Sequence, residues 1–341
     1  MKATLTARAD DAAARQRRIA TLRTVLLAVG FLVLVVAVNA LTHGSFLTAG
    51  NLTNVLRQIT INAIMAVGQT FVIITAGIDL SVGSLVGLAG VVAALFANAV
   101  HLPGPLAFLA TLVVALAVGC AAGWINALPV VKLGLPPFIT TLAMMQVARG
   151  LAFILAHGQP IPLANGDPFN WLGVGTFFDI PGFTGMPYQV AVMLAVVIVG
   201  AVLLGRTIFG RYVLALGGNE EAARLAGIDT GRVKTAVYVI SGACSALAGL
   251  MLMARFSSGI PQNGIGYELN AIAAVVVGGT SLMGGRGTIA GTFFGALLIG
   301  VLNNVMNLIG IESYTQMIVL GAVILLALIL DALRKRYAAA R

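Results

Sequence analysis

Four amide side chains recur along one apolar stretch of the sequence. Asn54, Gln58, Asn62 and Gln69 are separated by four, four and seven residues, and at about 100° per residue this spacing places them on one face of a helix. Amides both donate and accept hydrogen bonds. Such a face would either line a wet path through the protein or bond to neighbouring helices, and the spacing favours neither role over the other.

A polar break follows this stretch. The segment TAGIDLSVGSLVGLAG, residues 75–90, interrupts an apolar run with four glycines and one acid. Gly77 is suited to end the preceding helix, and Asp79 or Ser81 can cap the next one. If the break lay inside the bilayer, Asp79 would instead be a costly buried charge and a candidate functional residue. We favour a cap at the membrane surface.

Other polar residues lie farther along the chain. Gln146 and Arg149 are three apart on one helical face, where the arginine would either extend to the membrane surface or face a water-filled path; the first outcome is the more usual. Glu268 lies near a membrane boundary and is interpreted as a helix cap. Asn303 and Asn307 share a face, which is typical of hydrogen bonds between packed helices.

The longest charged island between apolar runs is GGNEEAARLAGIDTGRVK, residues 217–234. Asn219 can cap a helix of about two turns, and Gly227 can end it. Acidic side chains at the N-terminal end favour this helix, and its small apolar patch predicts docking into a groove on a partner. The residues expected to take part in docking are Asn219, Glu220, Glu221, Arg224, Leu225, Gly227 and Asp229, and the patch is formed by Ala222, Leu225 and Ala226.

The sequence lacks the motifs of several common kinds of catalytic and nucleotide-binding site. None of the four lysines lies in a Gly-x-x-x-x-Gly-Lys-[Ser/Thr] phosphate loop, and neither a nucleophile elbow nor an HExxH motif is present. Cys120 and Cys244 lie inside apolar segments, which is typical of free, buried thiols. We therefore expect no catalytic residue, no cofactor and no metal site.

The composition indicates the elements that must position these residues. Of the 341 residues, 59% are hydrophobic and 9% are charged, whereas soluble domains carry about 25% charge. We therefore predict an all-α polytopic membrane protein with eight to ten spans, ten being the preferred count, and a short cytoplasmic coupling helix. The expected spans are 20–41, 54–76, 82–100, 105–128, 138–156, 188–205, 233–254, 266–278, 288–309 and 314–330.

The distribution of basic residues sets the expected orientation. With ten spans and a cytoplasmic N-terminus, every lysine and arginine except Arg57, Arg149 and Arg255 falls on the cytoplasmic side, as the positive-inside pattern requires. The net charge of +9 therefore does not indicate nucleic acid. We expect a basic head (1–19), one transmembrane domain (20–333) and a basic tail (334–341). Within the domain, a coupling loop (206–234) is cytoplasmic and a long loop (157–187) faces the other side.

Four long blocks carry a family resemblance. They are TAGIDLSVGSLVGLAG, FITTLAMMQVARGLAFILAHGQPI, GGNEEAARLAGIDTGRVKTAVYVISG and YELNAIAAVVVGGTSLMGGRGTIAGTFFGALLIGVLNN. In order and spacing they resemble the permease subunits of bacterial ABC importers for ribose, xylose, galactose and related monosaccharides. The resemblance implies an inner-membrane protein that pairs with a second permease, identical or homologous, with a cytoplasmic ATPase subunit, and with a periplasmic sugar-binding protein.

The resemblance also bears on individual residues. Glu220, Glu221, Arg224 and Gly227 match the cytoplasmic loop that family members present to the ATPase, whereas Asn270 stands where such proteins often carry an aspartate. The residues expected along the translocation path are Gln58, Asn62, Gln69, Asp79, Ser81, Gln146, Arg149, Glu268 and Asn270.

The expected function is therefore that of the membrane-spanning permease subunit of an ATP-driven importer. This subunit would form the path by which a pentose or a hexose crosses the membrane. An ion-coupled secondary transporter of a small polar solute is the alternative, with Asp79 as a coupling acid. A channel or membrane scaffold is a third possibility, but the sequence has no recognisable selectivity filter or signalling domain.

Overall fold

A computed structural model describes residues 35–164, 167–178 and 185–339 of the chain. Within them the protein is mostly helical, with four two-residue strands in two antiparallel pairs, β1 with β4 and β2 with β3. The elements are α2 (Ala49–Ile74), α3 (Val82–Ala99), α4 (Gly104–Lys132), α5 (Pro137–Leu155), β1 (Ile161–Pro162), α6 (Asp167–Gly173), β2 (Thr176–Phe177), β3 (Met186–Pro187), α7 (Tyr188–Arg206), α8 (Ile208–Gly218), α9 (Glu220–Leu225), α10 (Thr230–Phe256), β4 (Ser258–Gly259), α11 (Tyr267–Val277), α12 (Ile289–Leu308) and α13 (Ser313–Ala339).

Seven helices in the described part of the chain are long and apolar enough to cross a membrane: α2, α3, α4, α5, α7, α10 and α12. A shorter apolar stretch, Ser313–Ile329, belongs to α13. Most of the first expected span, 20–41, and the whole basic head lie outside the described residues. The count of about ten spans is therefore not confirmed. The apolar helices nevertheless indicate a multi-pass membrane protein.

One expected span is corrected by the structure. The segment 266–278 forms α11, which has 11 residues and is about 16 Å long at 1.5 Å per residue. This length is about half of the hydrocarbon thickness of a bilayer. Its apolar composition comes from burial within the protein, because residues 271–276 are all buried.

The helix α2 ends in the polar break, but the residue in the left-handed conformation is Ala76 and not Gly77, which was expected to end the helix. Ala76, with φ of +59°, takes the left-handed position, while Gly77 N–H bonds to Val72 C=O and Ala76 N–H to Ile73 C=O. These two bonds form a Schellman motif. Gly77 is required for another reason, since a Cβ there would lie 2.8 Å from the Tyr238 hydroxyl oxygen.

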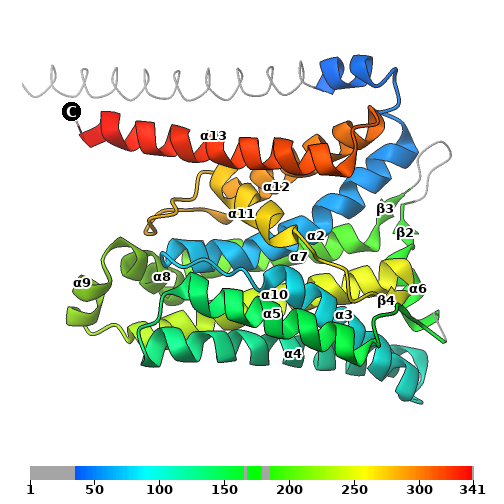
Figure 1. Cartoon of the computed structure of the whole chain (residues 1–341), viewed down its shortest axis with the longest axis horizontal. Helices are drawn as coiled ribbons and strands as arrows, with labels where there is room; N and C mark the ends of the chain where they lie inside the picture. Colours follow the sequence, from blue (N-terminus) through cyan, green and yellow to red (C-terminus); the bar gives the residue numbers. More distant parts are fainter. Residues whose placement is uncertain (1–34, 165–166, 179–184, 340–341) are drawn as a thin grey trace, which may run out of the picture.

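Close backbone contacts hold α10 against its neighbours. A Cβ added to Gly242 of α10 would overlap Gly119 of α4, and one added to Gly249 of α10 would overlap Val86 of α3. Small residues allow helix backbones to approach in this way within membranes. Figure 1 shows the resulting bundle, with α13 along one side of it next to α12 and α11.

The two ends of the bundle carry different segments. In Figure 1, α8 and α9 lie at one end of the long axis, and α6 lies with the short strands at the other. The charged island 217–234 and the described parts of the loop 157–187 are thus on opposite ends, as their assignment to opposite membrane sides requires.

Candidate functional site

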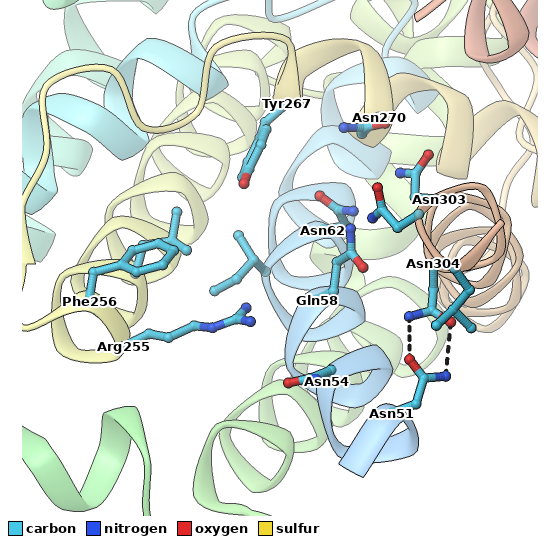
Figure 2. Close-up of a pocket in the computed structure, with 14 residues that line it drawn as sticks. Asn51, Asn54, Gln58, Asn62, Arg255, Phe256, Tyr267, Asn270, Asn303 and Asn304 are labelled. Atoms are coloured by element: carbon cyan, nitrogen blue, oxygen red, sulfur yellow. Dashed lines mark hydrogen bonds between the residues drawn. The ribbon is translucent and has the colours of Figure 1, made fainter. Parts of the chain in front are cut away.

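A cavity of about 470 Å³ opens between α2, α10, α11 and α12. Its volume lies within the range of about 300–1,000 Å³ that is typical of small-molecule sites. The lining residues are Asn51, Asn54, Gln58, Ile61, Asn62, Leu252, Arg255, Phe256, Tyr267, Asn270, Asn303, Asn304, Asn307 and Leu308. Eight of them are asparagine or glutamine, and Figure 2 shows these amides coming from three helices.

The amide row of α2 divides between two environments. Asn54, Gln58 and Asn62 line the cavity, because a spacing of four residues keeps them on one helical face. Gln69 does not reach the cavity and is fully buried. With its amide oriented to satisfy both partners, Gln69 donates to Asp79 C=O and accepts from Asp79 N–H, each at 3.2 Å. Gln69 therefore binds the backbone of the polar break and does not line this cavity.

The amides of α12 contribute another wall that sequence reasoning missed. Asn303, Asn304 and Asn307 all line the cavity, although Asn303 and Asn307 had been assigned to packing. Asn304 exchanges two side-chain hydrogen bonds with Asn51, at 3.0 and 2.8 Å (Figure 2). Asn304 and Asn51 thus join α12 to α2 as well as lining the cavity. The four-residue spacing of Asn303 and Asn307 had been recognised in the sequence, but it does not distinguish a cavity wall from helix packing.

The remaining polar wall comes from α10 and α11. Arg255 points across the cavity toward the amides of α2 in Figure 2, and its guanidinium carbon lies 5.7 Å from the centre of the Phe256 ring. Asn270 also lines the cavity, and its buried Oδ1 has no hydrogen-bond partner. Such an atom can accept a hydrogen bond from a ligand. Arg255 and Tyr267 were not among the expected path residues.

The chemistry of the lining determines which ligands it can hold. Among the described residues no aspartate or glutamate lines the cavity, and Arg255 is its only charged group. Amides supply donors and acceptors together, which suits a neutral solute with several hydroxyl groups. A cation would meet Arg255 without a compensating acid.

The structure corrects the interpretation of Asp79 as a surface cap. Its side chain is fully buried. Oδ1 accepts hydrogen bonds from Ser81 N–H at 2.9 Å and from the Ser81 hydroxyl at 2.6 Å, and Oδ2 accepts one from the Ser241 hydroxyl at 2.8 Å. Asn126 donates to the Ser81 hydroxyl oxygen at 2.9 Å. Asp79 and Ser81 do not line the cavity; they join the start of α3 to α4 and α10.

Arg149 also has a different role from the expected one. Its guanidinium donates to Pro261 C=O at 2.6 Å and to Asn263 C=O at 2.8 Å, so it holds the loop that precedes α11 and does not extend to the membrane surface. Gln146, on the same helix, is exposed. Glu268 lies in the first turn of α11, and its carboxylate would overlap a Cβ added to Gly83 of α3. None of these three side chains lines the cavity.

At the end of the bundle that carries α8 and α9, the predicted short helix is confirmed as α9. Asn219 caps it by accepting from Ala222 N–H at 2.9 Å, and Gly227, with φ of +85°, follows its end. Leu225 is 83% exposed, and Ala222 and Ala226 are exposed beside it. An apolar patch of this kind on the surface is typical of an interaction site.

The charges around α9 hold it against α10. Lys234 of α10 forms an ion pair with Glu220, whose Oε1 lies 2.6 Å from the lysine Nζ. Asp229 caps α10 by accepting from Arg232 N–H at 3.0 Å and pairs with the Arg232 side chain at 2.9 Å. Glu221 and Arg224 are exposed on α9. Asp229 therefore belongs to the start of α10, whereas the exposed patch belongs to α9.

Comparisons with known proteins show the family of the chain. The family model described as the permease component of branched-chain amino acid transport systems matches residues 51–328. Ribose import permease protein RbsC of Escherichia coli (strain K12) is 45% identical over 306 residues, which cover 89% of this chain and 92% of that protein. RbsC of Bacillus subtilis (strain 168) is 45% identical over 304 residues, covering 89% and 90%. Xylose transport system permease protein XylH of Escherichia coli (strain K12) is 36% identical over 349 residues, covering 86% and 88%. No solved structure matches the chain. The chain therefore belongs to this permease family, together with the ribose and xylose permeases.

Proposed function

We propose that this chain forms the translocation path of an ATP-driven importer for a monosaccharide, either a pentose or a hexose. The observation that carries the proposal is the cavity with eight amides and one arginine, which offers hydrogen bonds to hydroxyl groups and no carboxylate among the described residues. The similarity to ribose and xylose permeases supports the same substrate class.

Within this proposal the sugar exchanges hydrogen bonds to water for hydrogen bonds to Gln58, Asn62, Asn270 and neighbouring amides. The gain is small because each bond replaces one of similar strength. Weak binding allows release on the other side of the membrane. Selectivity then resides mainly in a periplasmic binding protein that delivers the sugar to the end of the bundle with α6 and the loop 157–187.

The driving force comes from a separate ATPase subunit at the opposite end. The exposed patch of Ala222, Leu225 and Ala226 on α9 docks into an apolar groove of that subunit. A second permease, identical or homologous, completes the membrane part. In this arrangement the protein lies in the bacterial inner membrane with both termini, including the head 1–19 and the tail 334–341, in the cytoplasm.

The double variant Gln58→Leu, Asn62→Leu tests the cavity. Uptake of radiolabelled ribose and xylose into vesicles is expected to fall about tenfold or more, because two hydrogen-bonding groups are lost from the path, while assembly with the ATPase stays intact. Gln146→Leu is the matched control, since Gln146 is an exposed amide outside the cavity. Unchanged uptake by the double variant would assign these amides to helix packing alone.

A second test removes the ATPase. Uptake is expected to cease when the gene for the ATPase subunit is deleted, because the sequence contains no phosphate loop of its own. Uptake that survived the deletion would contradict the proposal and favour an ion-coupled transporter.

A further inference from the structure

The end of α8 lies in unusually close contact with two other segments. A Cβ added to Gly217 would overlap the carbonyl oxygen of Ile74, the last residue of α2. Gly285 N–H donates to the same Ile74 oxygen at 2.9 Å. Three backbones, those of α2, α8 and the loop between α11 and α12, therefore meet at Gly217, Ile74 and Gly285, which we call the glycine junction.

Glycines are required in the loop as well as in α8. Gly284 and Gly285 have φ of +82° and +73°, a conformation that L side chains rarely adopt. A Cβ at Gly284 would lie 2.7 Å from the Gly217 carbonyl oxygen, and one at Gly285 would lie 2.8 Å from the Gly218 Cα. The junction therefore depends on backbone surfaces that no side chain separates.

The segments that meet at the junction also carry most of the cavity wall. The α2 helix runs from the junction to Gln58, 16 residues or about 24 Å away, and the loop of Gly285 joins α11 to α12. Direct bonds join α2 to α12, because the Thr70 and Thr292 hydroxyls lie 2.7 Å apart and Asn51 and Asn304 exchange two bonds. Of the fourteen residues that line the cavity, nine are polar residues of α2, α11 and α12. They are the eight amides and one tyrosine: Asn51, Asn54, Gln58, Asn62, Tyr267, Asn270, Asn303, Asn304 and Asn307.

The other side of the junction leads directly to α9. Gly218 ends α8, and Asn219 is both the C-cap of α8 and the N-cap of α9. The side of α8 that faces α2 is fixed by apolar packing, including the Phe71 and Phe209 rings with centroids 6.1 Å apart. Only Gly218 and Asn219 therefore separate the junction from the first residue of α9.

We infer that Gly217 and Gly285 are positioning residues for transport: they transmit the displacement of α9 to the α2–α11–α12 wall of the cavity. This inference rests on the proposed function, since it assumes that an ATPase moves α9. A side chain inserted at Gly217 pushes α8 away from Ile74, so that α9 still docks and moves but the cavity wall follows it less closely.

Gly217→Ala tests the inference, with Gly218→Ala as a matched control. Gly218 is the next residue of the same helix end, and a Cβ there meets nothing within 4 Å. In complexes reconstituted with the ATPase and the binding protein, G217A is expected to lower sugar uptake about tenfold or more. Its ATP hydrolysis and co-purification with the ATPase are expected to stay within about twofold of wild type, and G218A is expected to transport normally.

Comparison with Leu225→Asp separates this inference from the proposed function. If L225D loses the ATPase while G217A transports as well as wild type, the docking role stands and the junction has no transmitting role. If L225D keeps the ATPase and normal uptake, the proposed function itself fails. A G217A complex that hydrolyses ATP but imports little sugar supports the junction.

Hydrogen exchange of the unaltered complex decides the case if G217A does not assemble. The Gly285 amide, which bonds to Ile74, is expected to exchange at least about a hundredfold more slowly than in an unfolded chain. This protection is expected both without nucleotide and with bound ATP, because the junction moves as one unit. Exchange at the unprotected rate in either state would overturn the inference.

Discussion

Two polar regions share one face of α2 and differ in how their hydrogen bonds are satisfied. At the cavity, Asn54, Gln58 and Asn62 face a volume of about 470 Å³. Farther along the helix, Gln69 is fully buried and binds the backbone of Asp79. The same residue types at the same helical spacing can therefore line a ligand site or brace a chain break, depending on what packs against them.

The charges sharpen this difference. The buried region has a carboxylate, Asp79, with three hydrogen bonds from Ser81 and Ser241. The cavity has a cation, Arg255, and among the described residues no acid. Buried polar groups need fixed partners in the protein, whereas a transport site needs partners that are free for the solute. We therefore expect substitutions in the first region to affect stability and those in the second to affect uptake.

The largest expected effect is that of Asp79→Ala. It removes the acceptor of three hydrogen bonds and leaves buried hydroxyl and amide donors unsatisfied, which costs about 3 kcal/mol or more. Thermal unfolding of the purified permease in detergent measures this loss. Asp79→Asn, which keeps one acceptor oxygen, is expected to lose less. Equal stability of the Asp79→Ala variant and wild type would contradict the structural role of this cluster.

A smaller effect is expected from Arg149→Met, which acts on the loop that leads into the α11 wall of the cavity. The variant loses two charge-assisted bonds to Pro261 and Asn263. Because these bonds are only partly buried, water can replace them, and the free energy of unfolding is expected to fall less than in Asp79→Ala. The loop before α11 would then hold Tyr267 and Asn270 less firmly at the cavity. We expect uptake to fall several-fold with the ATPase still bound, as measured in reconstituted vesicles; Arg149→Lys should retain part of the activity. Full uptake by the methionine variant would show that the loop is held by other contacts.

The smallest expected effect is that of Asn270→Asp. This change introduces a carboxylate at a half-buried position that lines the same cavity as Arg255. We expect a smaller loss of stability than in Asp79→Ala and uptake within about threefold of wild type, because the position is only half buried and the new carboxylate keeps acceptor oxygens for the solute. A loss of folding as large as that of Asp79→Ala would erase the distinction between the two regions.

Sequence reasoning succeeded where the determinants are local. The cap of α9 at Asn219, the turn at Gly227 and the exposed patch with Leu225 all depend on residues within a few positions of one another. The apolar runs that identify the long helices are also read from neighbouring residues. The multi-pass helical fold and the permease family could therefore be predicted from the sequence.

It failed where a distant segment decides the environment. Asp79 has the residue type and position of a cap, but Ser241, 162 residues away, donates to its carboxylate. Arg149 bonds to carbonyl groups 112 and 114 residues away. The walls of the cavity likewise come from helices far apart in the sequence, so only Gln58, Asn62 and Asn270 of the nine expected path residues line it.

The most direct measurement is ATP-dependent uptake of radiolabelled ribose or xylose into proteoliposomes that hold the complete complex and have no ion gradient. The account predicts uptake with ATP and the binding protein, none without the ATPase, and loss of both uptake and ATPase co-purification for Leu225→Asp. Uptake that continued without ATP, or that was normal in the Leu225→Asp complex, would contradict it.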